Sequence, residues 1–279
     1  MEANSVALHP ERQNYISLYS GGGGLDLGFK TANPKARCIL YVEREISASA
    51  ILVDKIKRQE LDDAPIYSDT GTLDCTHFAG KVDWVIAGFP CQPYSYASNQ
   101  LKEKDERWLW EEPHIKRVLT EVEPRGIVLE NVSGIFSGGL QTIMGDLASF
   151  GYDAQWTCIK ASDVGSPQRR ERVFCLADRR GEGRYVADSI SKRGRGRNHK
   201  RKHAVDDFPA GPKASAKWRD ILSRRPDLAP ATLEYKVRRM ADGAERGLAR
   251  YQQLRIAGNL VIPEQANYAL QVLAQRINA

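Results

Sequence analysis

Short apolar runs alternate with segments of helical spacing along the first two thirds of the chain. The runs that predict strands are residues 15–19, 38–42, 83–87, 126–129, 152–159 and 173–177. Apolar residues recur at intervals of three and four in 115–122, 140–150 and 266–277, which predicts helices. Strands that alternate with helices over short connections predict an α/β fold with a doubly wound, mostly parallel sheet.

The pattern changes after residue 178. Residues 179–238 are polar and basic, with one short helical stretch near 214–224, and they predict a small second lobe. The segment 239–279 ends in a helix that needs the first domain to bury its apolar face. We therefore expect a large domain over 1–178, a small basic region over 179–238, and a bridging segment with a returning helix over 239–279.

The net charge of +6 is concentrated in one part of the chain. Residues 179–202 hold ten basic and two acidic side chains, so they carry +8 and the remainder sums to −2. This basic arm favours a polyanionic partner such as nucleic acid. A solvated linker remains the alternative, because residues 191–203 include no hydrophobic residue.

The five cysteines form no C-x-x-C pair and have no histidine spacing suited to zinc. An odd number without a disulfide spacing favours a reducing compartment, so we expect a cytoplasmic protein without a metal site. We expect no signal peptide, and no apolar run reaches the roughly 18 residues of a membrane span.

Cys91 is the cysteine most suited to chemistry. The apolar run 83–87 ends at Gly88, and Pro90 cannot continue a strand ladder, so the chain leaves the carboxyl edge of the sheet just before Cys91. Open α/β sheets bind ligands at that edge. Free cysteines are also often buried as small hydrophobes, so from position alone Cys91 is either a nucleophile or a core residue.

A glycine-rich turn follows the first predicted strand. Ser20 and the glycines at 21–24 precede an apolar helix start at Leu25, and a backbone without Cβ atoms allows close approach of a ligand. Glu43 ends the second strand about 20 positions later, where an acidic residue suits the ribose hydroxyls of a nucleoside cofactor. The glycines do not match G-x-G-x-x-G, so a dinucleotide is not supported.

Five motifs together resemble the cytosine-5 DNA methyltransferase family, in its compact phage and bacterial form. They are Y-S-G-G-G-G-L at 19–25, G-F-P-C-Q at 88–92 with Ser95, E-N-V at 130–132, Q-R-R-E-R at 168–172 and G-N-L-V-I-P at 258–263. The resemblance covers about 15–177 and continues from 238, and it leaves out the basic arm. It implies a Rossmann-like methyltransferase domain at 1–178 and a target-recognition region at 179–238.

The resemblance implies a role for each catalytic candidate. The Cys91 thiolate would add to C6 of a flipped-out cytosine, and Arg170 is a candidate for lowering the pKa of that thiol. Protonated Glu130 would face N3 and the exocyclic amine, and Arg172 would face O2. Two other interpretations stay open: an N-cap role for Glu130 beside Asn131, and a surface ion network of residues 170–172.

The implied cofactor is S-adenosylmethionine, with Glu43 on the ribose, Asp69 on the adenine amine and Tyr19 near the methionine part. Asp69 in S-D-T-G suits a turn former equally well. The full set of candidate cofactor residues is Tyr19, Ser20, Gly21, Gly23, Gly24, Leu25, Glu43, Asp69, Thr70, Pro90, Asn259 and Val261. The candidate DNA-binding residues are Gln92, Ser95, Arg195, Arg197, Lys200, Arg238 and Arg239.

Departures from the family pattern cluster near the cofactor. Ser17 stands where Asp is common, Tyr19 replaces the commoner Phe, Gly22 replaces a usually larger side chain, and Leu260 follows Asn259 where a small residue is usual. These changes suggest a substituted S-adenosylmethionine as an alternative donor, which would give a larger C5 modification. The short target-recognition region suggests short or relaxed sequence preference.

We expect a monomer that acts on double-stranded DNA in a bacterial or phage-infected cell, as a modification enzyme with or without a nuclease. The alternatives are an RNA cytosine-5 methyltransferase and a non-catalytic DNA-binding homologue. The RNA branch has a Cys-Phe-Thr signature that this sequence lacks. A pure binder has no use for a nucleophile.

Overall fold

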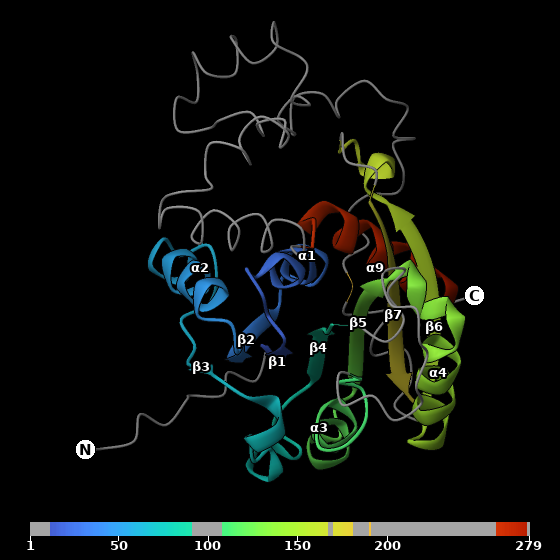
Figure 1. Ribbon diagram of the computed structural model, residues 1–279, viewed down its shortest axis with the longest axis horizontal. Coiled ribbons are helices and arrows are strands. Elements are labelled where there is room, and N and C mark those ends of the chain that lie inside the picture. The colour runs from blue at the N-terminus through green and yellow to red at the C-terminus, as the bar shows by residue number, and fades with distance from the viewer. Residues whose placement is uncertain (1–11, 91–107, 167–169, 181–189, 191–260, 278–279) are drawn as a thin grey trace, which may run out of the picture.

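The computed structural model describes residues 12–90, 108–166, 170–180, 190 and 261–277. These form a seven-stranded sheet of order β3-β2-β1-β4-β5-β7-β6 (Figure 1). The strands are β1 (Gln13–Leu18), β2 (Ala36–Val42), β3 (Ile66–Tyr67), β4 (Trp84–Gly88), β5 (Gly126–Val132), β6 (Tyr152–Lys160) and β7 (Glu171–Arg179). Strands β1 to β5 pair in parallel, and β7 runs antiparallel to both of its neighbours. The predicted doubly wound, mostly parallel, Rossmann-like sheet is confirmed.

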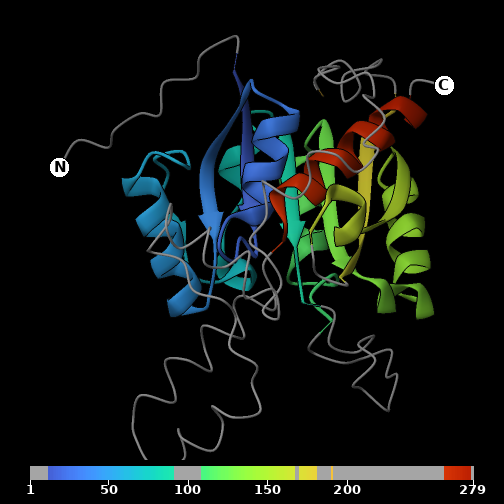
Figure 2. The same cartoon turned by 90° about the horizontal axis from the view of Figure 1, so that it is seen from above.

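Helices cover both faces of this sheet (Figure 2). The helices are α1 (Gly24–Ala32), α2 (Ile46–Lys57), α3 (Ile115–Val122), α4 (Gly139–Ser149) and α9 (Pro263–Ile277), with 3-10 turns η1 (Thr70–Thr72), η2 (Thr76–Phe78), η4 (Ser133–Ser137) and η5 (Ala161–Val164). One apolar cluster joins α3 and α4 to the sheet, and a second joins α1 and α9 to the opposite face. The central strands are therefore buried on both sides, as their unbroken apolar sequences predict.

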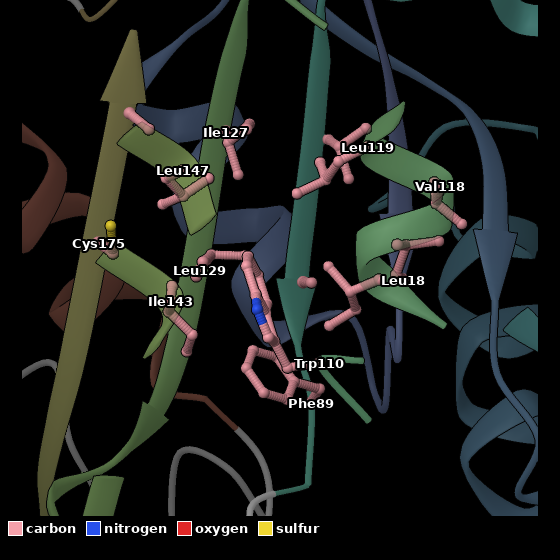
Figure 3. Packing of buried hydrophobic residues seen from close by; sticks show 14 of the residues in the cluster. Leu18, Phe89, Trp110, Val118, Leu119, Ile127, Leu129, Ile143, Leu147 and Cys175 are labelled. Atoms are coloured by element: carbon pink, nitrogen blue, oxygen red, sulfur yellow. The ribbon is translucent and has the colours of Figure 1, made fainter. Parts of the chain in front are cut away.

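The cluster under α3 and α4 reaches the carboxyl edge of the sheet (Figure 3). There Phe89, the residue after β4, lies 6.2 Å from Trp110 between ring centroids. The indole N–H of Trp110 donates to Asp146 Oδ2 at 2.7 Å, which satisfies its polar atom at the rim of the core. Two buried aromatic rings thus fix the backbone immediately before Pro90 and Cys91.

Helix α9 packs directly on α1, as the apolar face of the closing segment predicts. Gly28 makes this close approach possible, because a Cβ there would lie 2.5 Å from the carbonyl oxygen of Pro263 and 2.6 Å from Cβ of Ala266. Residues Ala266, Ala269, Leu270 and Leu273 are buried against the sheet and α1. Helix α9 therefore packs on the same sheet as α1.

Two elements were not predicted from the sequence. Helix α2 buries only Ala48 and Leu52, so its apolar stripe is too thin to give a helical signal. Strand β3 has two residues and presents no run at all. The strand predicted over 126–129 is also too short, because β5 continues through Glu130 and Asn131 to Val132.

The expected division at residue 178 stays a prediction, since most of the region that follows lies outside the described residues. β7 continues to Arg179 without a break at that point. Among the residues that the structure describes, no helix has the length and apolar character of a membrane span.

Candidate active site

The sheet changes direction between β1 and β4. From β1 the chain proceeds outward through β2 and β3, and from β4 it proceeds to the other side through β5. The carboxyl ends of strands on either side of such a switch point enclose the ligand crevice of an open α/β sheet. β7 is antiparallel, so its first residues return to the same edge, where Arg172 pairs with Val132.

The turn after β1 is held by backbone contacts to β2. The amide of Ser20 donates to the carbonyl of Val42 at 3.0 Å, and the Ser20 hydroxyl donates to the carbonyl of Ser17 at 3.0 Å. The amide of Gly21 donates to Glu43 Oε2 at 2.7 Å, and the amide of Glu45 donates to Glu43 Oε1 at 2.7 Å. Each oxygen of Glu43 keeps a second lone pair, which could accept a hydrogen bond from a ribose hydroxyl.

The glycines of this turn are required for different structural reasons. Gly21 has a φ of +54°, and no atom of the described residues lies within 4 Å of where its Cβ would stand, so this position leaves room for a ligand. A Cβ on Gly23 would come within 2.6 Å of Leu61, and one on Gly24 would overlap the carbonyl oxygen of Val261. Gly23 and Gly24 therefore serve close packing within the protein, and the side chain of Leu25 is buried in the core.

Asp69 lies in the turn that follows β3. Its Oδ1 accepts from the amide of Gly71 at 2.9 Å, so the turn-former interpretation is confirmed for that oxygen. Arg117 of α3 holds the same turn by donating from Nη2 to the carbonyl of Thr70 at 2.7 Å. The hydroxyls of Tyr19 and Thr70 are buried here and complete no hydrogen bond with the described residues. The Thr70 hydroxyl does lower the pKa of Tyr19, which burial raises to about 12, so the two oxygens are neighbours.

These features fit a bound nucleoside. Three features lie together at the carboxyl edge. Gly21 leaves room for a ligand, Glu43 can accept further hydrogen bonds, and the hydroxyls near Asp69 complete none with the described residues. Buried polar groups in proteins are normally hydrogen-bonded, so an unpartnered pair at a ligand crevice suits a polar ligand.

Glu130 and Arg172 form a buried ion pair across β5 and β7. Arg172 Nε lies 2.9 Å from Glu130 Oε1, and the two side chains are 13% and 8% exposed. Burial raises the pKa of Glu130, although the charges of Arg172 and Arg170 act to lower it. Glu130 occupies the interior of a strand, so the N-cap interpretation is wrong. Arg172 pairs with this buried carboxylate, so for Arg172 the surface ion network is wrong as well.

Arg170 precedes β7 and lies close to the same carboxylate. Burial and the charge of Arg172 lower the pKa of Arg170 to about 10, while Glu130 acts to raise it. The backbone carbonyl of Arg170 accepts from the amide of Ala161 at 2.6 Å and from the side-chain amide of Gln265. Helix α9 thereby helps to position the start of β7 behind Glu130.

Asn131 was quoted in a motif but given no role by the sequence. Its Nδ2 donates to the carbonyl of Phe89 at 3.1 Å, and its Oδ1 accepts from the amide of Val132 at 2.8 Å. His114, before α3, was missed entirely, and its ring lies against Gly71 beside Asp69. The one sequence feature that could have pointed to His114 is its position directly before the helix predicted over 115–122.

Several predicted site residues lie outside the described part of the chain. They are Cys91, Gln92, Ser95, Arg195, Arg197, Lys200, Arg238, Arg239 and Asn259. Pro90, directly before Cys91, and Val261, two residues after Asn259, are described, and Pro90 is exposed at the edge of the sheet. Within the described ranges, no three His, Cys, Asp or Glu side chains group as a metal site would require.

The comparison with known families decides the assignment. A family model described as C-5 cytosine-specific DNA methylase matches residues 13–244. The chain belongs to this family. The match extends through the basic arm, which the five motifs did not cover, and it ends before the predicted motif at 258–263.

Two curated members illustrate the similarity within this methylase family. Type II methyltransferase M.BsuRI of Bacillus subtilis is 33% identical over 198 residues, which cover 61% of this chain and 44% of that protein. Type II methyltransferase M.PspPI of Psychrobacter sp. is 35% identical over 182 residues, which cover 62% of this chain and 42% of that protein. The matched part is therefore less than half the length of either relative.

A solved structure, titled S. pombe Dnmt2 methyltransferase, overlaps with a TM-score of 0.49 at 23% identity and covers 62% of this chain and 51% of that one. Membership in the methylase family rests on the sequence match alone.

Proposed function

We propose that the chain is a DNA cytosine-5 methyltransferase that uses S-adenosylmethionine. The observation that carries the proposal is the buried pair of Glu130 and Arg172 at the carboxyl edge, beside the backbone that leads from Phe89 into Cys91. The family match supports the same reaction class.

The chain's own residues suit covalent catalysis on a pyrimidine. Addition of the Cys91 thiolate to C6 breaks the C5–C6 double bond, makes C5 an enamine carbon and shifts electron density toward N3 and O2. A carboxylic acid facing N3 and a guanidinium facing O2 would stabilise that charge. Burial raises the pKa of Glu130, which favours the protonated form that can donate to N3, and Arg172 supplies the fixed cation.

The cofactor would lie on the other side of the switch point. Bound S-adenosylmethionine would supply an electrophilic methyl group to the activated carbon. Glu43 would accept from its ribose hydroxyls and Asp69 from its adenine amine, while Gly21 leaves space above the turn. Ser20, Tyr19, Thr70, Pro90, Asn259 and Val261 would complete the pocket.

A substituted donor is the second candidate, favoured by one observation. The hydroxyl that distinguishes Tyr19 from Phe is buried beside the Thr70 hydroxyl, so this pocket carries polar groups that plain methyl transfer does not require. A group larger than methyl would then pass from the sulfonium to C5. Nucleoside mass spectrometry after incubation with each donor separates the two, and formation of 5-methylcytosine alone excludes the substituted donor.

The substrate of the proposed enzyme is double-stranded DNA. A base inside a duplex cannot meet a thiol in a crevice, so the target cytosine would be flipped out, with phosphate contacts from Gln92, Ser95 and the basic residues Arg195, Arg197, Lys200, Arg238 and Arg239. We further propose a monomer in the cytoplasm of a bacterial or phage-infected cell.

Transfer of labelled methyl groups from S-adenosylmethionine tests the proposal. Duplex DNA and tRNA are assayed side by side, followed by sequencing that maps the modified cytosines. We expect label in DNA at cytosine C5. Label only in tRNA would support the RNA alternative, and binding of DNA without any transfer would support a non-catalytic homologue.

A further inference from the structure

Three buried polar atoms around the η1 turn complete no hydrogen bond within the part of the chain that the structure describes, although two of them, the hydroxyls of Tyr19 and Thr70, are neighbours. The three are the hydroxyl oxygens of Tyr19 and Thr70 and the Nδ1 nitrogen of His114. Each comes from a different part of the chain: the end of β1, the turn after β3 and the residue before α3. An unpartnered buried polar atom costs free energy, and three around one turn indicate a place built for a polar ligand.

His114 occupies the N-cap position of α3 but does not cap it. Its imidazole packs over Gly71 instead, because a Cβ built there would lie 3.2 Å from Cε1 and 3.4 Å from Nδ1. The same Cβ would lie 3.4 Å from Asp69 Oδ1. The imidazole and the Asp69 carboxylate therefore flank one glycine, and they lie close enough to contact the same small group.

Arg117 fixes the two sides of this arrangement. Its Nε donates to the carbonyl of Pro113 at 2.8 Å, next to His114, and its Nη2 donates to the carbonyl of Thr70 at 2.7 Å, next to Asp69. Both oxygens of Glu121 accept from Nη1 at 2.7 Å, which holds the guanidinium in place. A planar guanidinium with this many partners makes a rigid link between the histidine and the turn.

We propose that His114 is a specificity-determining residue of the cofactor site, which reads the exocyclic amine of the adenine together with Asp69. The proposal rests on the methyltransferase function above and deepens it. An amine offers two N–H donors, and Asp69 with a neutral imidazole offers two acceptors. A 6-oxo purine would present an acceptor to these same atoms and leave them unpaired, which is the kind of mismatch that discriminates strongly.

The charge state of His114 follows from its surroundings. The charged groups that face it are Asp69 and Glu112, which favour the imidazolium, and Arg117 and Arg44, which oppose it. Burial is the largest influence and lowers the pKa of His114. Its ring is therefore neutral at pH 7, and in the tautomer that carries the proton on Nε2 its Nδ1 is an acceptor. Protonation at lower pH would turn Nδ1 into a donor and weaken binding of the amine.

Calorimetry on the full chain tests this inference without turnover. The dissociation constants of S-adenosylhomocysteine and S-inosylhomocysteine are measured for the wild type, His114→Ala and His114→Phe, which keeps the ring volume but not the acceptor. The matched control is His77→Ala, because His77 is exposed and pairs only with Asp74 among the described residues. Thermal melts confirm that each variant is folded.

We expect the wild type and His77→Ala to bind S-adenosylhomocysteine more tightly than S-inosylhomocysteine. In both His114 variants the ratio of the two dissociation constants should fall at least tenfold. The affinity of the wild type should also fall as the pH is lowered through the pKa of His114, and the variants should lack that component. An unchanged ratio of the two dissociation constants in both His114 variants would overturn the inference. Failure of the wild type to bind either nucleoside would instead contradict the proposed function, and the inference with it.

Discussion

The side-chain amide of Asn131 donates a hydrogen bond to the carbonyl oxygen of Phe89 at 3.1 Å, across the carboxyl ends of β5 and β4. Phe89 is the second residue before Cys91, and Asn131 follows Glu130 directly. One buried amide thus joins the backbone that leads to the proposed nucleophile to the strand that carries the proposed acid. In this account Asn131 is a positioning residue that sets the distance between the two.

Replacement of Asn131 with Ala should lower methyl transfer much more than it lowers stability. The loss of two hydrogen bonds is expected to reduce the free energy of unfolding by about 1–3 kcal/mol. Misplacement of reacting groups can cost on the order of 100-fold in rate. Single-turnover transfer and urea unfolding measure the two effects. Asn33→Ala is the control, because Asn33 is also buried but donates its hydrogen bond to Gln13, at the opposite end of β1 from the site. If both variants lose methyl transfer to the same extent, Asn131 has only a structural role.

The Glu130→Gln variant should bind DNA and lose transfer by about 100-fold or more, the usual contribution of general acid catalysis. Burial raises the pKa of Glu130, so the acid form persists to higher pH than in an exposed glutamate. If that form is the active one, the rate falls as the pH rises through the folded-state pKa. A pH profile of the single-turnover rate shows this decline in the wild type only, and an identical profile in Glu130→Gln would exclude Glu130 as its source.

Gly28→Ala should destabilise the fold by about 1–3 kcal/mol, the usual cost of overpacking. The added methyl group would lie 2.5 Å from the carbonyl oxygen of Pro263 and would push α9 away from α1. Gly145→Ala in α4 is the matched control, since none of the described residues has an atom within 4 Å of its added Cβ outside the helix's own backbone. Replacing this helix-interior glycine with alanine should raise the free energy of unfolding by about 0.5–1 kcal/mol. Equal effects of the two substitutions in urea unfolding would contradict the described packing of α9.

Asp26→Asn should make stability less dependent on pH. Asp26 is fully buried, accepts from the Ser17 hydroxyl at 3.2 Å, and has its pKa raised by burial from 3.8 to about 6. The folded state therefore holds the proton more tightly than the unfolded state. The stability of the wild type declines as the pH rises from about 4 to about 6 and stays lowered above that range.

The expected difference between Asp26→Asn and the wild type grows by about 3 kcal/mol over this interval, from 1.36 kcal/mol per pKa unit. Urea unfolding at several pH values measures it. Glu130 titrates in both proteins, so its contribution cancels. A difference that does not change with pH would mean that Asp26 has an ordinary pKa.

The central strands and the two-sided burial were predictable because their sequences are apolar without interruption. The end of β5 was not, since Glu130 and Asn131 look like the polar start of a loop. Their side chains are accommodated in a strand because Arg172 on β7 contacts the first at 2.9 Å and the Phe89 carbonyl accepts from the second. Contacts of this kind join residues more than 40 positions apart, and no local pattern reports them.

The candidate site was predictable as a set of motifs but not as a geometry. Glycine spacing suggested ligand approach at the whole turn, whereas a Cβ on Gly23 would meet Leu61 and one on Gly24 would meet the backbone of Val261. His114 carries no motif and becomes visible only when the turn at Asp69 folds against α3. The departure of Ser17 from the commoner Asp also has a structural reason, because its hydroxyl donates to the buried carboxyl of Asp26.

The most direct test of the central claim is covalent trapping with a duplex that contains 5-fluorocytosine at the mapped target, in the presence of S-adenosylmethionine. Fluorine at C5 blocks the elimination that would release the thiol, so the adduct accumulates. Peptide mass spectrometry of the product should locate the modified nucleotide on Cys91, and Cys91→Ser should give no adduct. Absence of an adduct with the wild type, or attachment through a different residue, would contradict the assignment of Cys91 as the nucleophile.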